Sequence, residues 1–374
     1  PLAKNELVKN ATIHFYDLNG RIRWRINDNN YVYVTLYNGR DKFAVSDMGV
    51  KFGNSVAAVN WNHTFSDRFF MKLHATYTNY DYEFNGSTNE MEMEWVSRIR
   101  DAGMRLDFSY MPAPEHLFEF GYTSNFQWFQ PGKAKGIGEL ESGVQIEQDI
   151  TMSRRQGFVN VLYFSNEHKL FNEKMELRYG LRLNRFDNVG PTTFYRVDEN
   201  YNLIEEDGQD IPSGDFFHHE YGLEPRLGIS YLISPNISIK AAYARTLQYV
   251  HLLSFSSAGS PMEIWIPSSP CIKPQSSHQV SAGVFATLFR KDYEASVELF
   301  YKDLDNVLDF KDHPNLLLYD KIETELRFGT GKSYGAEFLV RRNKGALTGW
   351  ISYTWSRSFR TIPGVNNGRK YRSP

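Results

Sequence analysis

The sequence predicts an all-β protein, a fragment of a transmembrane antiparallel β-barrel with about fourteen strands. Three observations support this class. Apolar and polar residues alternate with a period of two along most of the 374-residue chain. The extended segments often exceed about ten residues, whereas strands in globular proteins cluster at about five or six. Very short polar turns alternate with longer connections, a pattern that is typical of outer-membrane barrels.

The alternation can be followed strand by strand. In 71–77 the apolar residues Met71, Leu73 and Tyr77 fall on one face of a pleated strand and the polar residues Lys72 and His74 on the other. The same pattern predicts further strands at 104–110, 175–184, 237–243, 293–302 and 351–356. No segment shows the period of an amphipathic helix.

The connections divide into two sets, which predicts that they lie at opposite rims of the barrel. Short turns are expected at 28–30, 66–67, 112–114, 234–236, 291–292 and 343–345. Longer loops are expected at 38–50, 86–91, 131–142, 187–214, 251–274, 305–328 and from 359 onward. In barrels of this kind the longer loops face the outside of the cell.

Composition excludes several other classes. Hydrophobic residues make up 41% of the chain and charged residues 23%, so the chain folds. A formal net charge of −2 offers no basic excess for nucleic-acid binding. The one cysteine, Cys271, excludes an intrachain disulfide framework and a cysteine-rich metal site, and we interpret it as incidental. No apolar run approaches the about 18 residues of a transmembrane helix.

The polar stripe supplies one set of candidate functional residues. A charge on the lipid face at mid-depth costs about 2 to 4 kcal/mol, so we expect this stripe to face the lumen. Pairing between neighbouring strands is as good an explanation of these residues as contact with a ligand. The ten candidates are Lys72, His74, Arg105, Asp107, Arg178, Arg182, Lys240, Glu298, Glu337 and Arg341.

Aromatic residues in the expected loops supply a second set. Large apolar side chains at a water-exposed rim indicate a binding role, such as stacking on a sugar ring or a siderophore. Packing of the loops against each other is the alternative. The candidates for contact with an extracellular ligand are Trp128, Phe129, Tyr195, Phe255 and Trp265.

Three local motifs favour no catalytic or metal site. Gly329–Ser333 ends like a phosphate-binding loop, but Leu326 replaces the first glycine, and the chain continues as a strand. His218–Glu220 lacks a second histidine four residues beyond His219, where Leu223 stands. The acidic residues of 205–210 lack the spacing of a calcium loop. We therefore expect no catalytic residues, no metal ligands and no cofactor.

Six segments resemble strands of the TonB-dependent outer-membrane receptors, and their order and spacing carry the resemblance across nearly the whole chain. They are Asn10–Asn19, Glu224–Tyr231, Ala241–Thr246, Val297–Asp303, Gly329–Phe338 and Ile351–Arg357. Barrels of that family close with 22 strands around a plugged lumen. The resemblance implies that residues 1–374 belong to one barrel domain, with the plug, the first strands and the last strands outside this sequence, and that the lumen candidates face the plug.

The resemblance also implies a function. It predicts an outer-membrane active transporter that imports a scarce siderophore, vitamin or oligosaccharide, driven by a TonB-type coupling protein that engages an N-terminal segment. Outer-membrane lipid and a surface lipoprotein are further expected partners. The alternatives are a passive porin without a plug, an outer-membrane enzyme and a soluble carbohydrate-binding protein. No Gly-x-Ser-x-Gly element supports the enzyme.

Overall fold

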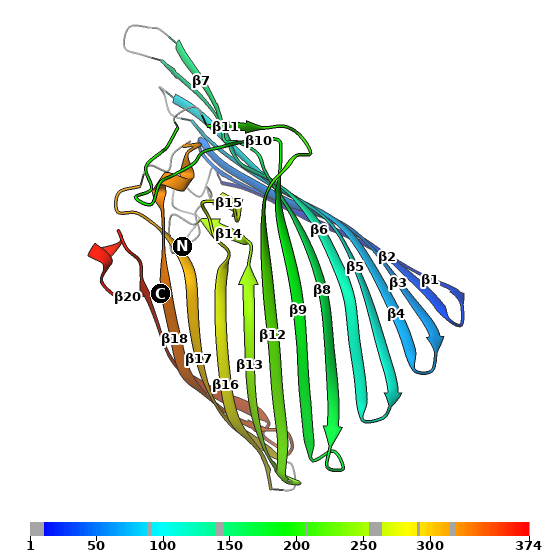
Figure 1. Cartoon of the computed structure of the whole chain (residues 1–374). Coiled ribbons are helices and arrows are strands. Elements are labelled where there is room, and N and C mark those ends of the chain that lie inside the picture. The colour runs from blue at the N-terminus through cyan, green and yellow to red at the C-terminus, as the bar shows by residue number, and fades with distance from the viewer. Residues whose placement is uncertain are drawn as a thin grey trace.

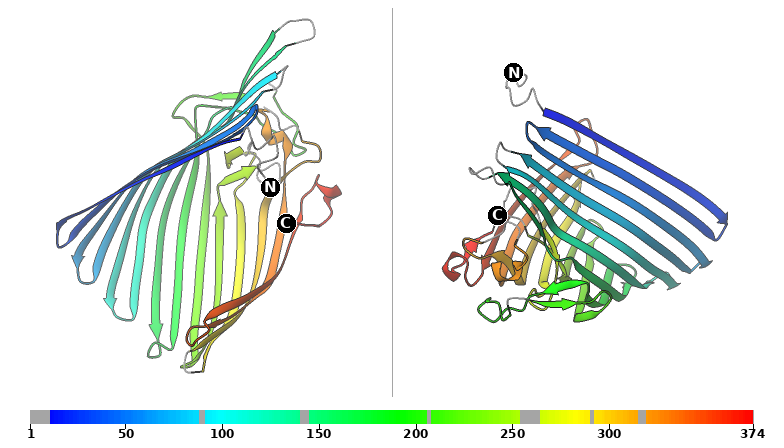
Figure 2. Two further views of the ribbon diagram at one scale, coloured as in Figure 1. Left: turned by 180° about the vertical axis from the view of Figure 1, so that it is seen from behind. Right: turned by 90° about the horizontal axis from the view of Figure 1, so that it is seen from above.

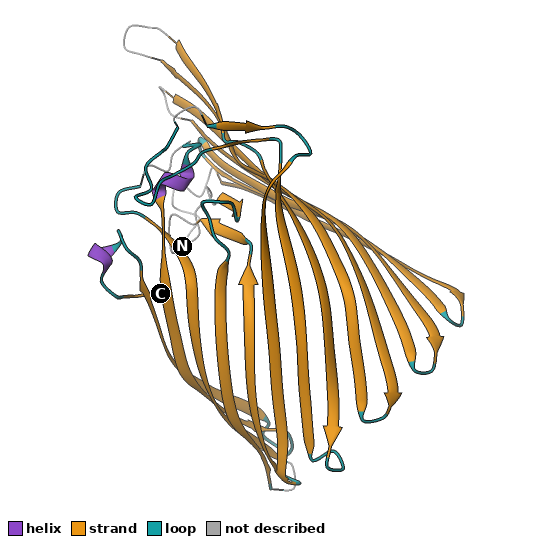
Figure 3. Ribbon diagram, viewed as in Figure 1, coloured by secondary structure: helices purple, strands orange, loops and turns teal. Residues whose placement is uncertain are grey.

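A computed structural model describes residues 11–87, 91–139, 145–205, 208–253, 264–289, 292–314 and 319–373. One antiparallel sheet contains sixteen strands, and without the short β7 and β20 it contains fourteen. The prediction of about fourteen antiparallel strands is therefore confirmed. No helix among the described residues is long and apolar enough to cross a membrane. Figure 3 shows helical turns only in the connections.

The strands of this sheet follow one another in sequence order, with two small hairpins outside it. The first half contains β1 (Ala11–Asn27), β2 (Asn30–Val45), β3 (Met48–Ser66), β4 (Phe69–Ser87), β5 (Met91–Ala113), β6 (His116–Glu139), β7 (Gln145–Thr151) and β8 (Arg155–Leu170). The second half contains β9 (Met175–Val189), β12 (Phe216–Ser234), β13 (Ile237–Gln248), β16 (Gln275–Leu288), β17 (Tyr293–Phe310), β18 (Leu326–Arg342), β19 (Gly349–Thr361) and β20 (Tyr371–Arg372). The two hairpins are β10 (Thr192–Phe194) with β11 (Gln209–Ile211), and β14 (Val250–Leu253) with β15 (Ile264–Pro267).

The sheet curves strongly, and both hairpins lie at the end that carries the long connections (Figures 1 and 2). The outer edges of β1 and β20 are unpaired within the described residues, so the sheet is open. We call the face that packs against β14 and β15 the inner face, and the opposite face the outer face. Trp95 on β5 belongs to the same buried cluster as Ile264 and Ile266 of β15, which identifies the inner face.

Apolar side chains line up across the outer face, because the strand register brings the apolar stripe of each strand beside the next. Val297 pairs with Val284 on β16 and with Phe338 on β18. Leu162 and Leu183 are likewise direct neighbours on β8 and β9, and both are exposed. A continuous apolar surface of this kind suits contact with lipid chains.

The predicted boundaries of two long loops are wrong. The segment 38–50 continues β2 and β3 as far as a tight turn at Ser46 and Asp47, and most of 131–142 belongs to β6. A membrane crossing needs only about 9–11 strand residues, so these hairpins extend beyond the apolar part of the sheet. The alternation fades there because both faces meet water, while the backbone ladder continues.

Substitution at Val297 tests the assignment of the two faces. We expect Val297→Arg to destabilise the full-length barrel by about 2–4 kcal/mol, because it places a charge among lipid chains. The matched control is Glu298→Arg on the inner face, which puts an arginine opposite Glu337 and should preserve folding. Urea unfolding in lipid vesicles measures both variants, and equal stability would contradict the assignment.

Candidate functional site

Strand register and shared cavities put the ten predicted lumen residues on the inner face. His74 pairs with Arg105 on β5, and Lys72 pairs with Asp107. Asp107 lies two residues beyond Arg105, on the same face of β5. These β5 residues lie on the same face as Trp95, because an even number of residues separates them. Arg178, Lys240 and Glu298 line one shallow cavity of about 420 Å³. Arg182 shares its face with Arg178, while Glu337 and Arg341 pair with Glu298 and Glu294 on β17.

Ion pairs and hydrogen bonds involve several of these residues, both within one strand and across strands. Arg105 contacts Asp107 at 2.7 Å, and the Tyr163 hydroxyl on β8 also donates to Asp107. Arg178 contacts both Glu167 at 2.8 Å and Glu176 at 2.6 Å. The contacts that cross strands, Tyr163 with Asp107 and Arg178 with Glu167, stabilise the wall.

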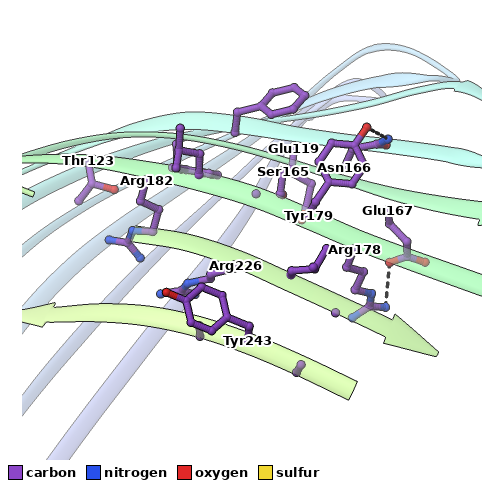
Figure 4. A pocket seen from close by; sticks show the side chains of 18 of the residues that line it. Glu119, Thr123, Ser165, Asn166, Glu167, Arg178, Tyr179, Arg182, Arg226 and Tyr243 are labelled. Atoms are coloured by element: carbon purple, nitrogen blue, oxygen red, sulfur yellow. Dashed lines mark hydrogen bonds and ion pairs between the residues drawn. The ribbon is translucent and has the colours of Figure 1, made fainter. Parts of the chain in front are cut away.

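Glu224 on β12 is shared between two arginines, Arg182 at 3.6 Å and Arg226 at 3.5 Å. Its other carboxylate oxygen accepts a hydrogen bond from Asn184 at 2.9 Å. These side chains lie near a shallow cavity of about 620 Å³ whose lining includes Arg178, Arg182 and Arg226 (Figure 4). The cavity surface therefore alternates in charge, with each arginine close to a carboxylate.

A buried apolar cluster fills the inner side of the sheet at the end with the long connections. Its members come from β5, from the β7–β8 connection, from β14, β15 and the β15–β16 connection, from the turn η2 (Ile322–Glu325) and from the first residue of β18. They are Trp95, Met152, Leu253, Ile264, Ile266, Ile272, Ile322 and Leu326. We call β14, β15 and η2, with the connecting residues 268–272 and 319–321, the cap.

Polar contacts, which we call the latch, join the cap to the neighbouring connections and to β8. The latch consists of Ser153, Arg155, Tyr195, Asp320 and Glu323. Asp320 accepts hydrogen bonds from the backbone N–H of Ser153 at 2.6 Å, from its hydroxyl at 2.9 Å and from the Tyr195 hydroxyl at 3.2 Å. Arg155, the first residue of β8, forms an ion pair with Glu323 of η2. The Arg155 side chain is 8% exposed and that of Glu323 is 0% exposed. A buried pair of this kind fixes one arrangement of the connections, because either charge alone would be costly.

A second contact joins the cap to β9. Asn188 donates a hydrogen bond to the carbonyl of Ser268 at 2.7 Å, and the ring of Phe186 stacks on Tyr249 at 5.1 Å between centroids. Ser268 also lies 3.1 Å from Nε2 of His251, which is buried. Burial lowers the pKa of His251 to about 4, so this imidazole is neutral near pH 7.

The predicted ligand-contact aromatics do not form a single exposed rim. Trp128 and Phe129 lie within strand β6 instead of a loop, and they point to opposite faces. Trp128 is 36% exposed beside Phe126 on the outer face, whereas Phe129 is 2% exposed on the inner face. Tyr195 is half-buried against Asp320, and Trp265 is half-buried on β15. Phe255 lies outside the described residues.

The three motifs that we interpret as neither catalytic nor metal-binding lie in strands or in a connection. Gly329–Ser333 lies within β18, as predicted, and a Cβ on Gly329 would approach the Thr361 carbonyl to 2.2 Å, so only glycine fits there. His218 contacts Glu220 at 3.2 Å on one face of β12. In the acidic segment, Glu206 and Asp207 lie outside the described residues. Within the described part of the chain, no group of three or more His, Cys, Asp or Glu residues is arranged to hold a metal ion.

Sequence reasoning missed the latch. More than 160 residues of sequence separate Ser153 from Asp320 and Arg155 from Glu323, and none of the four belongs to a recognisable motif. The one available signal was the apolar run Ile264–Ile266 inside an expected loop. Such a run indicates a buried segment, although it does not identify the surface that buries it.

The fold and the inward-folded cap define a wall from a large outer-membrane barrel. A family model described as the TonB dependent receptor-like β-barrel matches residues 5–374. The chain therefore belongs to the TonB-dependent receptor β-barrel family, and its location is the outer membrane of a Gram-negative envelope. A comparison with curated protein sequences found no match.

Solved structures of similar fold include receptors and transporters with different cargo. The siderophore receptor PiuA from Acinetobacter baumannii is similar with a TM-score of 0.67 at 12% identity, over 97% of this chain and 59% of that one. The copper transporter OprC gives 0.66 at 11% identity, over 97% and 55%. The RagAB peptide transporter gives 0.58 at 10% identity, over 95% and 48%. The chain thus spans about half the length of these structures.

The buried ion pair of Arg155 and Glu323 can be tested with single substitutions and their combination. Removing one partner of a buried ion pair costs about 3–5 kcal/mol, so Arg155→Met or Glu323→Leu alone should strongly increase opening of the cap. The combined variant should recover most of the loss, because it leaves no unpaired buried charge. Hydrogen exchange of β14, β15 and η2 in the full-length protein measures the opening. Additive effects of the two substitutions would contradict the assigned pair.

The buried His251 predicts a pH dependence of the cap. Its pKa is lowered to about 4 in the folded state, so the opened cap binds the extra proton as the pH falls below about 6.5. We expect the cap to lose about 2 kcal/mol of stability between pH 7 and pH 5. Hydrogen exchange of β14 at the two pH values measures this loss. His251→Gln is the control, and an unchanged pH dependence in that variant would exclude His251 as the cause.

Proposed function

We propose that this chain forms part of the wall of an active outer-membrane transporter, which imports a scarce extracellular ligand with energy from a TonB-type coupling protein. The family match over residues 5–374 is the observation that carries the proposal. The cap supports it, because a connection folded inward and held by buried contacts obstructs free diffusion through the lumen. Controlled import then requires a change in the cap.

The proposed ligand is a siderophore, a vitamin or an oligosaccharide. Several similar structures are receptors for ferric siderophores, among them the ferripyoverdine receptor of Pseudomonas aeruginosa. Tyr195 and Trp265 are the aromatic candidates that lie at the cap, where movement of the latch would expose them. Phe129 is buried beneath this region and Trp128 lies on the outer face, so neither is included in the proposed ligand site.

We propose that a plug, further strands and the segment that engages the coupling protein belong to the same full-length protein. The paired charges of the inner face, including Arg178, Arg182 and Glu224, would then face the plug. A surface lipoprotein at the long-connection end is a further proposed partner.

A passive channel is the second candidate, because an inward-folded connection such as the cap is compatible with it as well. A plugless porin also carries an inward-folded connection, which narrows its lumen. The two candidates differ in conductance and in energy use, because a plugged transporter conducts little without its coupling partner and a porin conducts steadily.

Two measurements on the full-length protein distinguish these functions. We expect the purified protein to show no steady conductance in a planar bilayer, and uptake of a labelled siderophore panel by expressing cells to stop when an uncoupler collapses the proton motive force. Cells without the protein provide the background. Steady conductance together with uptake that resists the uncoupler would replace the transporter proposal with the porin.

A further inference from the structure

A basic band crosses the outer face of β2 to β5, near the end with the long connections. Its members are Arg40, Lys42, Lys51, Arg98 and Arg100, with the carboxylates Asp81 and Glu83 between them. Register places Arg40 and Asp81 on either side of Gly53, and Arg98 beside Asp81. The β4 and β5 members lie an even number of residues from the apolar Tyr77 and Met104, which assigns them to the outer face.

The basic band carries an excess of positive charge. Five cations and two carboxylates leave a net charge of +3. Arg40 pairs with Asp81 and Lys51 pairs with Glu83, both at 2.7 Å. Three cations remain without an acidic partner in the described part of the chain, namely Lys42, Arg98 and Arg100, and all three are exposed.

Two like charges face each other within the band. Lys42 on β2 lies directly opposite Lys51 on β3. Like charges in direct cross-strand positions destabilise a sheet. Glu83 accepts only one hydrogen bond from this pair, through Lys51 at 2.7 Å. An anion placed beside Lys42 would remove this repulsion.

The basic band borders the apolar part of the outer face. Toward the short turns, two residues from Arg100 and four residues from Arg40 and Asp81, the register aligns one row of mostly apolar and aromatic residues. These are Leu36, Ala57, Tyr77, Ala102 and Phe126. Arg100 pairs with Trp128, whose ring lies 4.6 Å from that of Phe126. Tryptophan concentrates at the level of lipid headgroups. The band therefore lies at the headgroup level of the leaflet on the long-connection side.

The opposite border of the same strands is different. Near the short turns, the outer face of β2 to β5 carries mostly apolar and aromatic side chains and no lysine or arginine. Its residues are Val32, Trp61, His63, Phe65, Phe69, Met71, Phe108 and Tyr110. Four of these aromatic rings form a chain of contacts from Phe65 through Phe69 to Phe108 and Tyr110. On β2 to β5 the cationic excess is thus confined to the end with the long connections.

We propose that the basic band binds phosphate groups on lipid headgroups of the outer leaflet. Arginine presents a planar fork of donors that matches phosphate geometry, and lysine binds phosphate as a point charge. Arg98 and Arg100 lie two residues apart on one face, so a single headgroup can contact both. Lys42 offers a second contact on β2. The lipid would hold this part of the wall at a fixed depth in the membrane.

Native mass spectrometry of the full-length protein in detergent tests this proposal, with lipid A that carries two phosphates as the probe. The variant K42Q/R98Q/R100Q should bind the probe on the order of 100-fold more weakly at low salt. The charge-preserving variant K42R/R98K/R100K should bind within a few-fold of the unchanged protein and shows that substitution itself is tolerated. The matched control R21Q/R23Q/R25Q removes three arginines from the inner face of β1 and should leave binding unchanged.

Two comparisons establish the source of the phosphate. Dephosphorylated lipid A should bind the unchanged protein as weakly as lipid A binds the neutral variant K42Q/R98Q/R100Q. Inorganic phosphate at millimolar concentration should not displace lipid A. Equal binding of the neutral variant and the β1 control would overturn the proposal. Equal binding of lipid A and dephosphorylated lipid A to the unchanged protein would overturn it as well. Displacement of lipid A by inorganic phosphate would also overturn the proposal, because the basic band would then be a site for a free anion.

Discussion

The structure depends on the continuous backbone ladder of its sheet. A backbone N–H or C=O group without a partner in a lipid interior costs several kcal/mol, so each membrane-spanning strand needs a neighbour on both sides. Within the described residues, the strands of the large sheet between β1 and β20 meet this requirement, with the exception of the short β7. The ladder fixes the register, and the register decides which side chains share a face. Every functional feature of this chain follows from that assignment of faces.

The two faces of the sheet differ in how they carry charge. The outer face must remain uncharged within the lipid, and apolar neighbours such as Leu162 and Leu183 achieve this. The inner face carries many charges and keeps them close to opposite charges, as Glu224 shows between Arg182 and Arg226. Beyond the apolar part, the outer face of β2 to β5 is cationic near the long connections and carries no lysine or arginine near the short turns. The wall is therefore oriented by its charges as well as by its connections.

The cap adds a hydrophobic core to the described sheet. A single curved sheet buries little apolar surface, and the largest buried side chains include Trp95, Ile264 and Ile266, where the cap meets the wall. Gly132 on β6 makes this packing possible, because a Cβ there would approach the Trp95 ring to 2.3 Å. The Arg155–Glu323 pair adds specificity to this apolar contact, since it is favourable in one register of the two segments.

The alternation of apolar and polar residues is enough to predict the strands, their antiparallel order and the shared face of the ten lumen candidates, because a period of two is a local property of the chain. It placed Arg105 and Arg182 on one face without any knowledge of their neighbours. Only the tertiary structure decided that 38–50 continues as strand, that Trp128 and Phe129 point to opposite faces, and that Ser153 meets Asp320. The physical reason is that these features depend on contacts between segments far apart in sequence, where side-chain alternation carries no information about partners.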